Sequence, residues 1–388
     1  MKNHKDGLIA YLIFSFVLLI VSTDVFGDEY LISFENQRPA IDFGMKELRK
    51  VVFIDGKPRI VVDMNAENMA FLDDFGKIEK KRTLTPKGKF LLSKNANFIG
   101  VRSLREEWSY DFSLENSQGE VIWQNLFGSD LILISDKGEA VIVVGYKSHF
   151  EKMGLDFYDD TGQLAIHLDT DIIKNIEISP LGDKLYLSTA SDLAAYDMQA
   201  NKLWERTTEG GKIFVSDNGE LIFNVQVSGE REIYSIEIYD NQGILLGKLE
   251  FPNRCELLAI SSDSKFIAVR ENKKLYLFEA QTQDLIWTYG PELDLISGFS
   301  AMGVGAADVA ENAELTAVIL TGVKKVGPQP NDYEFSHYLR ILDIERRKIF
   351  ERFIENVNFQ LQVKVSLKGG FIVVWTPNNI YNFKIERK

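Results

Sequence analysis

Cysteine and histidine are scarce in this sequence, and their scarcity excludes several kinds of site. Cys255 is the one cysteine among 388 residues, so no disulfide can form within the chain. It lies in the apolar run CELLAIS, which predicts a buried structural thiol rather than a nucleophile. The histidines beyond the N-terminus, His149, His167 and His337, lie far apart. Neither HExxH nor CxxC occurs, so we expect no metal and no other cofactor.

A surplus of basic residues is also missing. The formal net charge is -13 at pH 7, which argues against a phosphate-binding surface, so we expect no nucleic-acid partner. The phosphate-binding motif GxxxxGK[ST] does not occur. The Gly-rich run SGFSAMGVGAADVA at 297–310 is interpreted as a loop and an inner strand rather than a phosphate cradle.

The first 27 residues form a separate segment. Two lysines, Lys2 and Lys5, precede the apolar run GLIAYLIFSFVLLIV at 7–21, and the small-residue pattern VFG follows at 25–27. This order predicts a signal peptide, residues 1–27, whose removal leaves Asp28 as the first residue. We therefore expect export to a periplasmic or extracellular location, with no stable membrane span in the mature chain. The alternative is an uncleaved N-terminal membrane anchor.

One short phrase recurs along the rest of the chain: a Ser, two further residues, then Gly or a substitute, then an apolar run. SDKGEAVIVV begins at Ser135, SPLGDKLYLS at Ser179 and SDNGELIFNV at Ser216. In the second copy Gly88 competes with Ala96 as the turn residue. The marked turn positions lie 37 to 56 residues apart and are Gly56, Ala96, Gly138, Gly182, Gly219, Ser264, Ala313 and Gly369.

A second phrase alternates with the first: an aromatic or aliphatic residue, then an acidic residue, two further residues and Gly. YDDTGQLAI from Tyr158 and YDNQGILLG from Tyr239 are clear copies. Its turn positions are Gly76, Gly119, Gly162, Ala200, Gly243, Gln283 and Arg346. Two turns per unit of about 40 residues, each flanked by period-2 apolar runs, predict four short strands per unit. We therefore predict an all-β fold, a β-propeller of four-stranded antiparallel blades.

The paired phrases resemble the WD-type and pyrroloquinoline-quinone-type propeller repeats. The late tryptophans Trp123, Trp204 and Trp287 suggest the second type. The resemblance covers roughly residues 50–385 and implies a fold, since propellers carry many unrelated activities. The quinone-dependent dehydrogenases that share this repeat have adjacent cysteines near the cofactor, and a chain with one cysteine cannot supply them.

The ends of the chain decide the number of blades. The last unit is one strand short, and EYLISF at 29–34 is a spare strand before the first unit. Pairing the two closes the ring and removes an exposed sheet edge. We therefore predict eight blades in a single domain, residues 28–388. Seven blades is the alternative, if one of the first two units is wrongly phased.

Acidic clusters are present, but their spacing fits turns better than a metal site. Asp156, Asp159 and Asp160 lie in LDFYDDTG, and Asp63 and Glu67 lie in DMNAEN. A calcium ion needs about six to eight converging oxygens, whereas aspartates in turns are ordinarily satisfied by their own backbone.

Loop length distinguishes the two faces of the predicted ring. The two short phrases lie on one face, whereas the long segments 103–108, 146–154, 288–298 and 322–337 lie on the other. Long loops on a rigid scaffold are where function is usually found. The candidate binding residues on this loop-rich face are Trp108, Phe150, Tyr289, Lys324, Lys325, Asp332, Tyr333, Phe335 and His337.

The sequence favours an exported, monomeric binding module, whose partner is another protein or a surface polymer. The alternative is an enzyme, a hydrolase or lyase with a polar site at the central channel. A deep polar pocket holding carboxylates with shifted pKa values favours the enzyme. A flat aromatic and charged rim favours binding.

Overall fold

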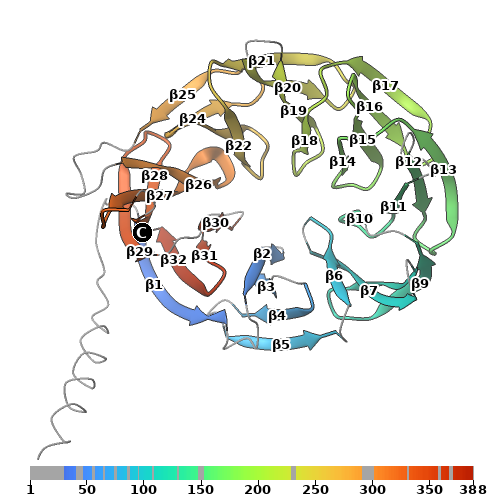
Figure 1. Cartoon of the computed structure of the whole chain (residues 1–388), viewed down its shortest axis with the longest axis horizontal. Coiled ribbons are helices and arrows are strands. Elements are labelled where there is room, and N and C mark those ends of the chain that lie inside the picture. The colour runs from blue at the N-terminus through green and yellow to red at the C-terminus, as the bar shows by residue number, and fades with distance from the viewer. Residues whose placement is uncertain are drawn as a thin grey trace, which may run out of the picture.

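The computed structural model is an all-β ring (Figure 1). It describes residues 30–40, 47–54, 57–63, 66–73, 77–84, 88–94, 96–106, 109–128, 131–146, 153–228, 233–290, 301–329, 332–356, 360–366 and 370–387. These residues form eight four-stranded sheets in which every paired neighbour is antiparallel. The predicted eight-bladed propeller is therefore confirmed.

In each blade the first strand lies nearest the ring centre, and the last lies at the outer edge (Figure 1). The first four blades are β2(Leu48–Ile54), β3(Lys57–Asp63), β4(Asn68–Leu72), β5(Ile78–Thr83); β6(Lys89–Leu92), β7(Phe98–Glu106), β8(Ser109–Asn116), β9(Val121–Phe127); β10(Leu131–Ile134), β11(Val141–Tyr146), β12(Met153–Tyr158), β13(Leu164–Thr170); and β14(Asn175–Ile178), β15(Lys184–Ser188), β16(Asp192–Asp197), β17(Lys202–Thr207). The next three are β18(Lys212–Val215), β19(Leu221–Ser228), β20(Ile233–Asp240), β21(Leu245–Phe251); β22(Cys255–Ile260), β23(Phe266–Glu271), β24(Lys274–Glu279), β25(Leu285–Tyr289); and β26(Ala301–Val309), β27(Leu315–Lys325), β28(Tyr333–Asp343), β29(Lys348–Asn356).

The eighth blade is built from both ends of the described chain. Its strands are β30(Gln362–Val365), β31(Phe371–Trp375), β32(Asn379–Arg387) and, as the outer strand, β1(Tyr30–Pro39). Strand β1 pairs with β32 from Tyr30 opposite Arg387 to Pro39 opposite Asn379. The ring is thus closed by hydrogen bonds between two segments that are far apart in sequence, and β32 is not left as the edge strand of a three-stranded blade.

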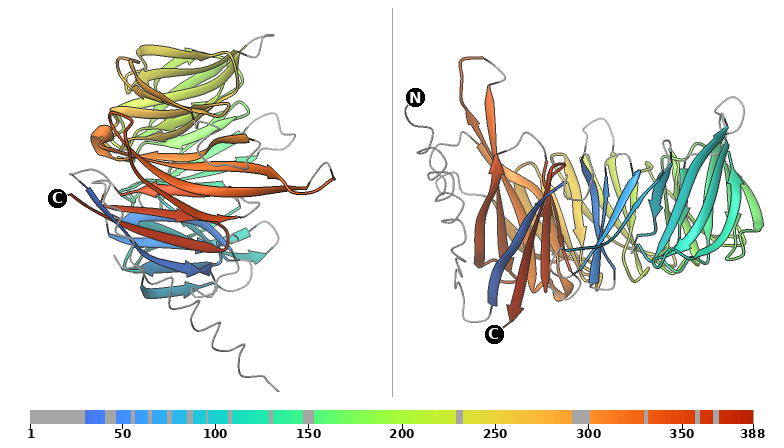
Figure 2. Two further views of the ribbon diagram at one scale, coloured as in Figure 1. Left: turned by 90° about the vertical axis from the view of Figure 1, so that its left-hand side faces the viewer. Right: turned by 90° about the horizontal axis from the view of Figure 1, so that it is seen from below.

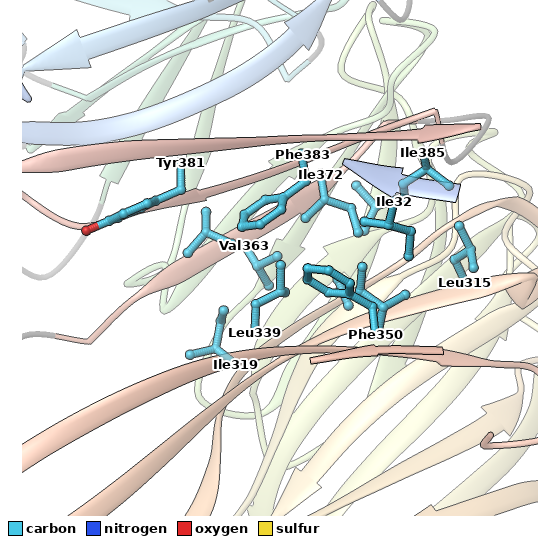
Figure 3. Close-up of a cluster of buried hydrophobic side chains, with 14 of the residues drawn as sticks. Ile32, Leu315, Ile319, Leu339, Phe350, Val363, Ile372, Tyr381, Phe383 and Ile385 are labelled. Atoms are coloured by element: carbon cyan, nitrogen blue, oxygen red, sulfur yellow. The ribbon is translucent and has the colours of Figure 1, made fainter. Parts of the chain in front are cut away.

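Apolar side chains hold the closing blade against its neighbour (Figure 3). Phe383 is fully buried, and its ring lies 5.4 Å from that of Phe34 in β1 and 5.9 Å from that of Phe350 in β29. Ile32 joins the same cluster. This cluster joins β1, near the start of the described chain, to β29 and β32, near its end. Side-chain packing therefore closes the ring together with the backbone hydrogen bonds between β1 and β32.

The turn residues marked in the sequence adopt the left-handed conformation that both phrases require. Every marked position among the described residues has a positive φ, including the non-glycines Ala96, Ala200, Ser264, Ala313, Gln283 and Arg346. Ala96, rather than Gly88, is therefore the turn residue of the second blade. In the first phrase the residue three after Ser donates its N–H to the Ser carbonyl, as Gly182 does to Ser179 at 2.9 Å.

Neighbouring blades dock through the late tryptophans. The ring of Trp204 packs on the turn at Gly243 in the next blade, where an added Cβ would lie 2.5 Å from the ring. Its indole N–H donates to the carbonyl of Asn241 at 3.3 Å, and Arg206 donates to that of Gly243 at 2.7 Å. Trp123 packs on Gly162 in the same way. The repeated Trp therefore links the outer strand of one blade to a turn of the next.

Within the described residues, no helix is long and apolar enough to cross a membrane.

Candidate functional site

The structure presents two candidate sites, at opposite ends of the ring. The first is a cavity of about 420 Å³ at the mouth of the central channel, on the side of the Ser-x-x-Gly turns. Residues of all eight blades line it: Val52, Phe53, Lys94, Asn97, Asp136, Lys137, Pro180, Leu181, Asp217, Ile260, Ser262, Asp308, Val309, Lys364 and Val365. A smaller cavity of about 180 Å³ adjoins it and shares Lys94, Asp217, Ile260, Asp308 and Lys364.

Strand alternation explains how charged side chains reach this channel. The inner strand of each blade is short, and its successive side chains point alternately into the blade and toward the channel. In β14 the buried Ile176 is followed by the partly exposed Glu177. In β30 the buried Val363 and Val365 flank the exposed Lys364. The alternation that builds each blade core therefore also places polar groups around the channel.

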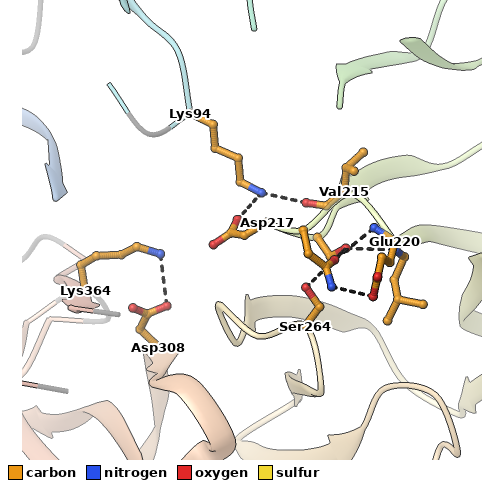
Figure 4. A network of polar contacts seen from close by, with 10 residues as sticks. Lys94, Val215, Asp217, Glu220, Ser264, Asp308 and Lys364 are labelled. Atoms are coloured by element: carbon orange, nitrogen blue, oxygen red, sulfur yellow. Dashed lines mark hydrogen bonds and ion pairs between the residues drawn. The ribbon is translucent and has the colours of Figure 1, made fainter. Parts of the chain in front are cut away.

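Two ion pairs join different blades at the channel mouth (Figure 4). The ammonium of Lys94, from the turn of blade 2, lies 2.6 Å from a carboxylate oxygen of Asp217, in the turn of blade 5. It also donates to the carbonyl of Val215 at 2.8 Å. Both charged side chains are about half exposed, so water screens this pair and its net contribution to stability is small.

The second ion pair contains a buried carboxylate. Asp308, in β26, accepts a hydrogen bond from the backbone N–H of Val365 at 2.7 Å, and the ammonium of Lys364 lies 3.3 Å away. Burial raises the pKa of Asp308 above its ordinary value, and the charge of Lys364 opposes that rise. The Asp308 carboxylate in turn raises the pKa of Lys364. Lys364 itself is half exposed to the channel.

Glu177 is a further acidic group of the channel, beside Asp136, Asp217 and Asp308. It lines the smaller cavity beside Phe214 and Leu258. Burial raises its pKa, and the charges of Lys94, Lys212 and Lys50 oppose the rise. No described residue donates a hydrogen bond to its carboxylate. The channel therefore holds a desolvated carboxylate with hydrogen-bonding capacity to spare.

The second candidate site is the hairpin of β27 and β28, whose strands of 11 residues are the longest in the described chain. The hairpin projects from the ring on the end away from the Ser-x-x-Gly turns (Figure 2). Its tip, defined here as residues 324–335, carries exposed Val326 and Tyr333, at 57% and 42% of their full exposure. Strand pairing sets Lys325 opposite Tyr333 and Lys324 opposite Glu334.

The predicted binding residues fall into four groups. Lys324, Lys325 and Tyr333 are exposed at the hairpin tip, and Phe335 is partly exposed beside them. Asp332 holds the turn: its carboxylate accepts the N–H of Gln329 at 2.8 Å, and its carbonyl accepts that of Val326 at 2.9 Å. Trp108 and Phe150 lie outside the residues that the structure describes.

Tyr289 and His337 do not have the exposed surface expected of them. Tyr289 is 8% exposed and packs between blades 6 and 7, where its hydroxyl contacts Arg340 and its ring lies 5.6 Å from that guanidinium. His337 is 2% exposed, with a ring nitrogen 3.1 Å from the hydroxyl of Thr321 on the paired strand. The reason is alternation: Tyr289 shares the inward face of β25 with Trp287.

The channel residues were not among the candidates from the sequence. The sequence does contain a signal for some of them. NIEI and QVKV are short strands in which a charged residue alternates with apolar ones. If such a strand is the inner strand of its blade, the charged residue faces the channel. No such signal exists for the pairing of Lys94 with Asp217, which depends on the curvature of the whole ring.

The acidic turn considered for calcium is satisfied by its own chain. Asp159 accepts hydrogen bonds from the N–H groups of Thr161 and Gln163, at 2.9 and 3.0 Å, and from the Thr161 hydroxyl at 2.7 Å. The hydrogen bond from the Thr161 side chain is the main cause that lowers the pKa of Asp159. Among the described residues, no group of three or more His, Cys, Asp or Glu could hold a metal ion. Cys255 is buried, and its burial raises the pKa of the thiol to about 11.

No family model matches this sequence, and no curated protein matches it. Among solved structures, the chain is similar to a eukaryotic initiation factor at 10% identity, with a TM-score of 0.51, over 86% of this chain and 90% of that one. It is also similar to Kluyvelomyces marxianus Hsv2 at 10% identity, with a TM-score of 0.49, over 80% and 98% of the two chains. At this identity the likeness to the initiation factor shows the propeller fold alone.

Proposed function

We propose that this protein is a binding module that holds another protein at the tip of the β27–β28 hairpin. The observation that carries the proposal is the exposure of Val326 and Tyr333 on a segment that projects from an otherwise regular ring. A strand of 11 residues is about 36 Å long, whereas β15, with five residues, is about 17 Å long. The first part of the extra length is still buried, as Leu320 is, but the last residues, 323–325 and 333–335, are partly or fully exposed and lie beyond the blade core.

The composition of the tip suits a protein partner. An aromatic and an aliphatic side chain flanked by charge are typical anchors of an interface. Lys324 and Lys325 are exposed beside them, on a chain whose net charge is -13. This local basic pair favours a partner surface with an apolar centre and acidic residues at its rim.

The test compares two double variants of the mature protein in its native cells. Val326→Ser with Tyr333→Ala alters the hairpin tip, and Leu245→Ser with Leu285→Ser alters similarly exposed aliphatic residues on outer strands. We expect the tip variant to bind its partner about 5- to 1000-fold more weakly, and the outer-strand control to bind as the unchanged protein does. Equal binding by both variants contradicts the proposal.

Export of the mature protein is part of the same proposal. It rests on the basic start, the apolar run and the cleavage pattern of residues 1–27. Mass spectrometry of the N-terminus is expected to find Asp28. An intact Met1 in the membrane fraction supports the anchor instead.

We further propose that the repeat is of the pyrroloquinoline-quinone type rather than the WD type. The support is the docking of Trp123 and Trp204 on the turns of the following blades. This assignment concerns the ancestry of the blades and carries no reaction with it.

A second function is favoured by a specific observation, the polar cavity at the channel mouth. Asp308 and Glu177 both have raised pKa values there, and groups of this kind serve as general acids or bases in hydrolases and lyases. The second candidate is therefore an enzyme with its site in the channel. Turnover that is lost in Glu177→Gln, with an unchanged melting temperature, supports it, and activity that survives in both Glu177→Gln and Asp308→Asn contradicts it.

A further inference from the structure

The two adjoining channel cavities have the size and lining of a ligand site. Their volumes are about 420 and 180 Å³, and small-molecule sites usually enclose about 300–1,000 Å³. One wall is apolar, with Phe214, Leu258 and Ile260 around the smaller cavity. Charged groups of both signs line the same two cavities. A ligand that fills this space therefore meets an apolar surface on one side and fixed charges on the other.

The cationic groups of the channel have hydrogen-bonding capacity to spare. An ammonium carries three N–H donors. That of Lys94 has two partners, Asp217 and Val215, and that of Lys364 has Asp308 alone among the described residues. Both lysine side chains are about half exposed and extend into the channel mouth (Figure 4). Together they offer three N–H donors to an oxyanion.

The anionic side is Glu177, which accepts no hydrogen bond from any described residue. Its carboxylate lies in the smaller cavity with Lys94 and Lys364. The raised pKa shows that the surrounding lysines do not fully offset its burial. A further cation beside Glu177 would stabilise the ionised carboxylate.

Uncommitted donors and an uncommitted carboxylate in one cavity call for a ligand that carries both charges. A purely anionic ligand leaves the carboxylate of Glu177 without a hydrogen-bond donor. A purely cationic ligand leaves the remaining N–H donors of Lys94 and Lys364 without an acceptor. A neutral polyol forms hydrogen bonds with both groups but neutralises neither.

We propose that the channel mouth binds a small zwitterion with an apolar body, whose carboxylate lies between Lys94 and Lys364 and whose ammonium faces Glu177. This is the chemistry of a free amino acid or of a short peptide. The proposal is independent of the hairpin and of any turnover in the channel.

Calorimetry with a matched set of probes at fixed ionic strength tests it. Leucine carries both charges, isocaproate only the carboxylate, isoamylamine only the ammonium, and glucose neither. We expect leucine to bind at least about tenfold more tightly than isocaproate or isoamylamine, because each charged hydrogen bond that is lost costs at least that factor. The dipeptide Ala-Leu, compared with leucine, separates a peptide ligand from a free amino acid.

Single substitutions assign the two ends of the ligand. Lys94→Gln is expected to weaken the binding of leucine and isocaproate about tenfold and to leave the binding of isoamylamine unchanged. Glu177→Gln is expected to weaken the binding of leucine and isoamylamine and to leave that of isocaproate unchanged. Lys94→Arg keeps the charge and should retain most of the leucine affinity. Lys248→Gln, on the outer strand β21, is the matched control and should bind leucine normally.

Three results overturn the proposal: glucose that binds more tightly than leucine, isocaproate that equals leucine, or no binding by any probe. Lys94 is half exposed, so its substitution should leave the fold intact, which a melting curve of each variant verifies. If Lys94→Gln and Lys248→Gln bind leucine equally, the assigned position of the carboxylate is wrong.

Discussion

The two faces of the ring differ in how much the length of their strand connections varies from blade to blade. The face that carries the Ser-x-x-Gly turns is called the turn end here, and the opposite face is called the hairpin end. At the turn end the connections repeat almost unchanged, with N–H···O distances of 2.8 to 3.0 Å from the fourth residue back to the Ser at Ser135, Ser179, Ser216 and Ser261. At the other end the connection in blade 4 spans residues 189–191, whereas in blade 7 both strands extend to 11 residues. The turns of the first face are constrained because they dock on neighbouring blades, as Gly243 does on Trp204. The short connection of blade 4 also touches the segment that leads to the next blade, at Gly210, whereas the exposed tip of the β27–β28 hairpin extends beyond the ring.

The largest effect should come from the core that both ends share. Phe383→Ala removes a fully buried ring from the closing cluster, so we expect the free energy of unfolding to fall by about 3–5 kcal/mol. Phe353→Ala is the control, because its ring is 47% exposed and lies 5.4 Å from that of Tyr338, outside the closing cluster. Denaturant unfolding measures both. Similar losses in the two variants would mean that the cluster does not close the ring.

The next largest loss of stability is expected from substitutions in the turns that dock on neighbouring blades. Gly243 and Gly219 both have a positive φ, but an added Cβ meets the Trp204 ring at 2.5 Å in the first and only Pro180 at 3.8 Å in the second. We expect Gly219→Ala to cost about 1 kcal/mol of stability, from backbone strain. Gly243→Ala should cost about 2–3 kcal/mol, since it also displaces the indole. Equal losses would show that blade docking adds nothing to the turn.

A smaller effect follows from pH and concerns Tyr186, near the turn end of blade 4. Burial, aided by the charge of Asp183, raises the pKa of Tyr186 above 10. The folded protein therefore keeps a proton that the unfolded chain loses, and stability falls as the pH rises above 10. Tyr186→Phe should reduce this slope by about 1 kcal/mol per pH unit, as measured by urea unfolding between pH 9 and 11. An unchanged slope means that Tyr186 is accessible to solvent.

The smallest effect on stability is expected at the hairpin tip. Val326→Ser with Tyr333→Ala removes only exposed side chains, so the free energy of unfolding should change by less than about 0.5 kcal/mol. The melting curve checks this. A loss above about 2 kcal/mol would place the tip in the core and would remove the contrast between the two ends.

The turn end could be predicted from the sequence because its determinants are local. Every marked position that the structure describes has a positive φ, even where Gly is replaced, as at Gln283 and Arg346. Burial is harder to predict: the sequence places Tyr289 among the candidate binding residues of the loop-rich face, although it shares a buried strand face with Trp287. The channel could not be predicted, because Lys94 and Asp217 are 123 residues apart and meet only across a closed ring.

Site-specific photocrosslinking tests the central claim, that the hairpin end holds the partner, most directly. A photoreactive phenylalanine analogue replaces Tyr333 at the tip or Ile244 at the turn end, both exposed in the structure, at 42% and 53%. Irradiation of the native cells, followed by mass spectrometry, compares the two adducts. If the hairpin tip holds the partner, position 333 gives one discrete protein adduct and position 244 gives none. An adduct from position 244 alone, or the same adduct from both positions, would contradict that claim.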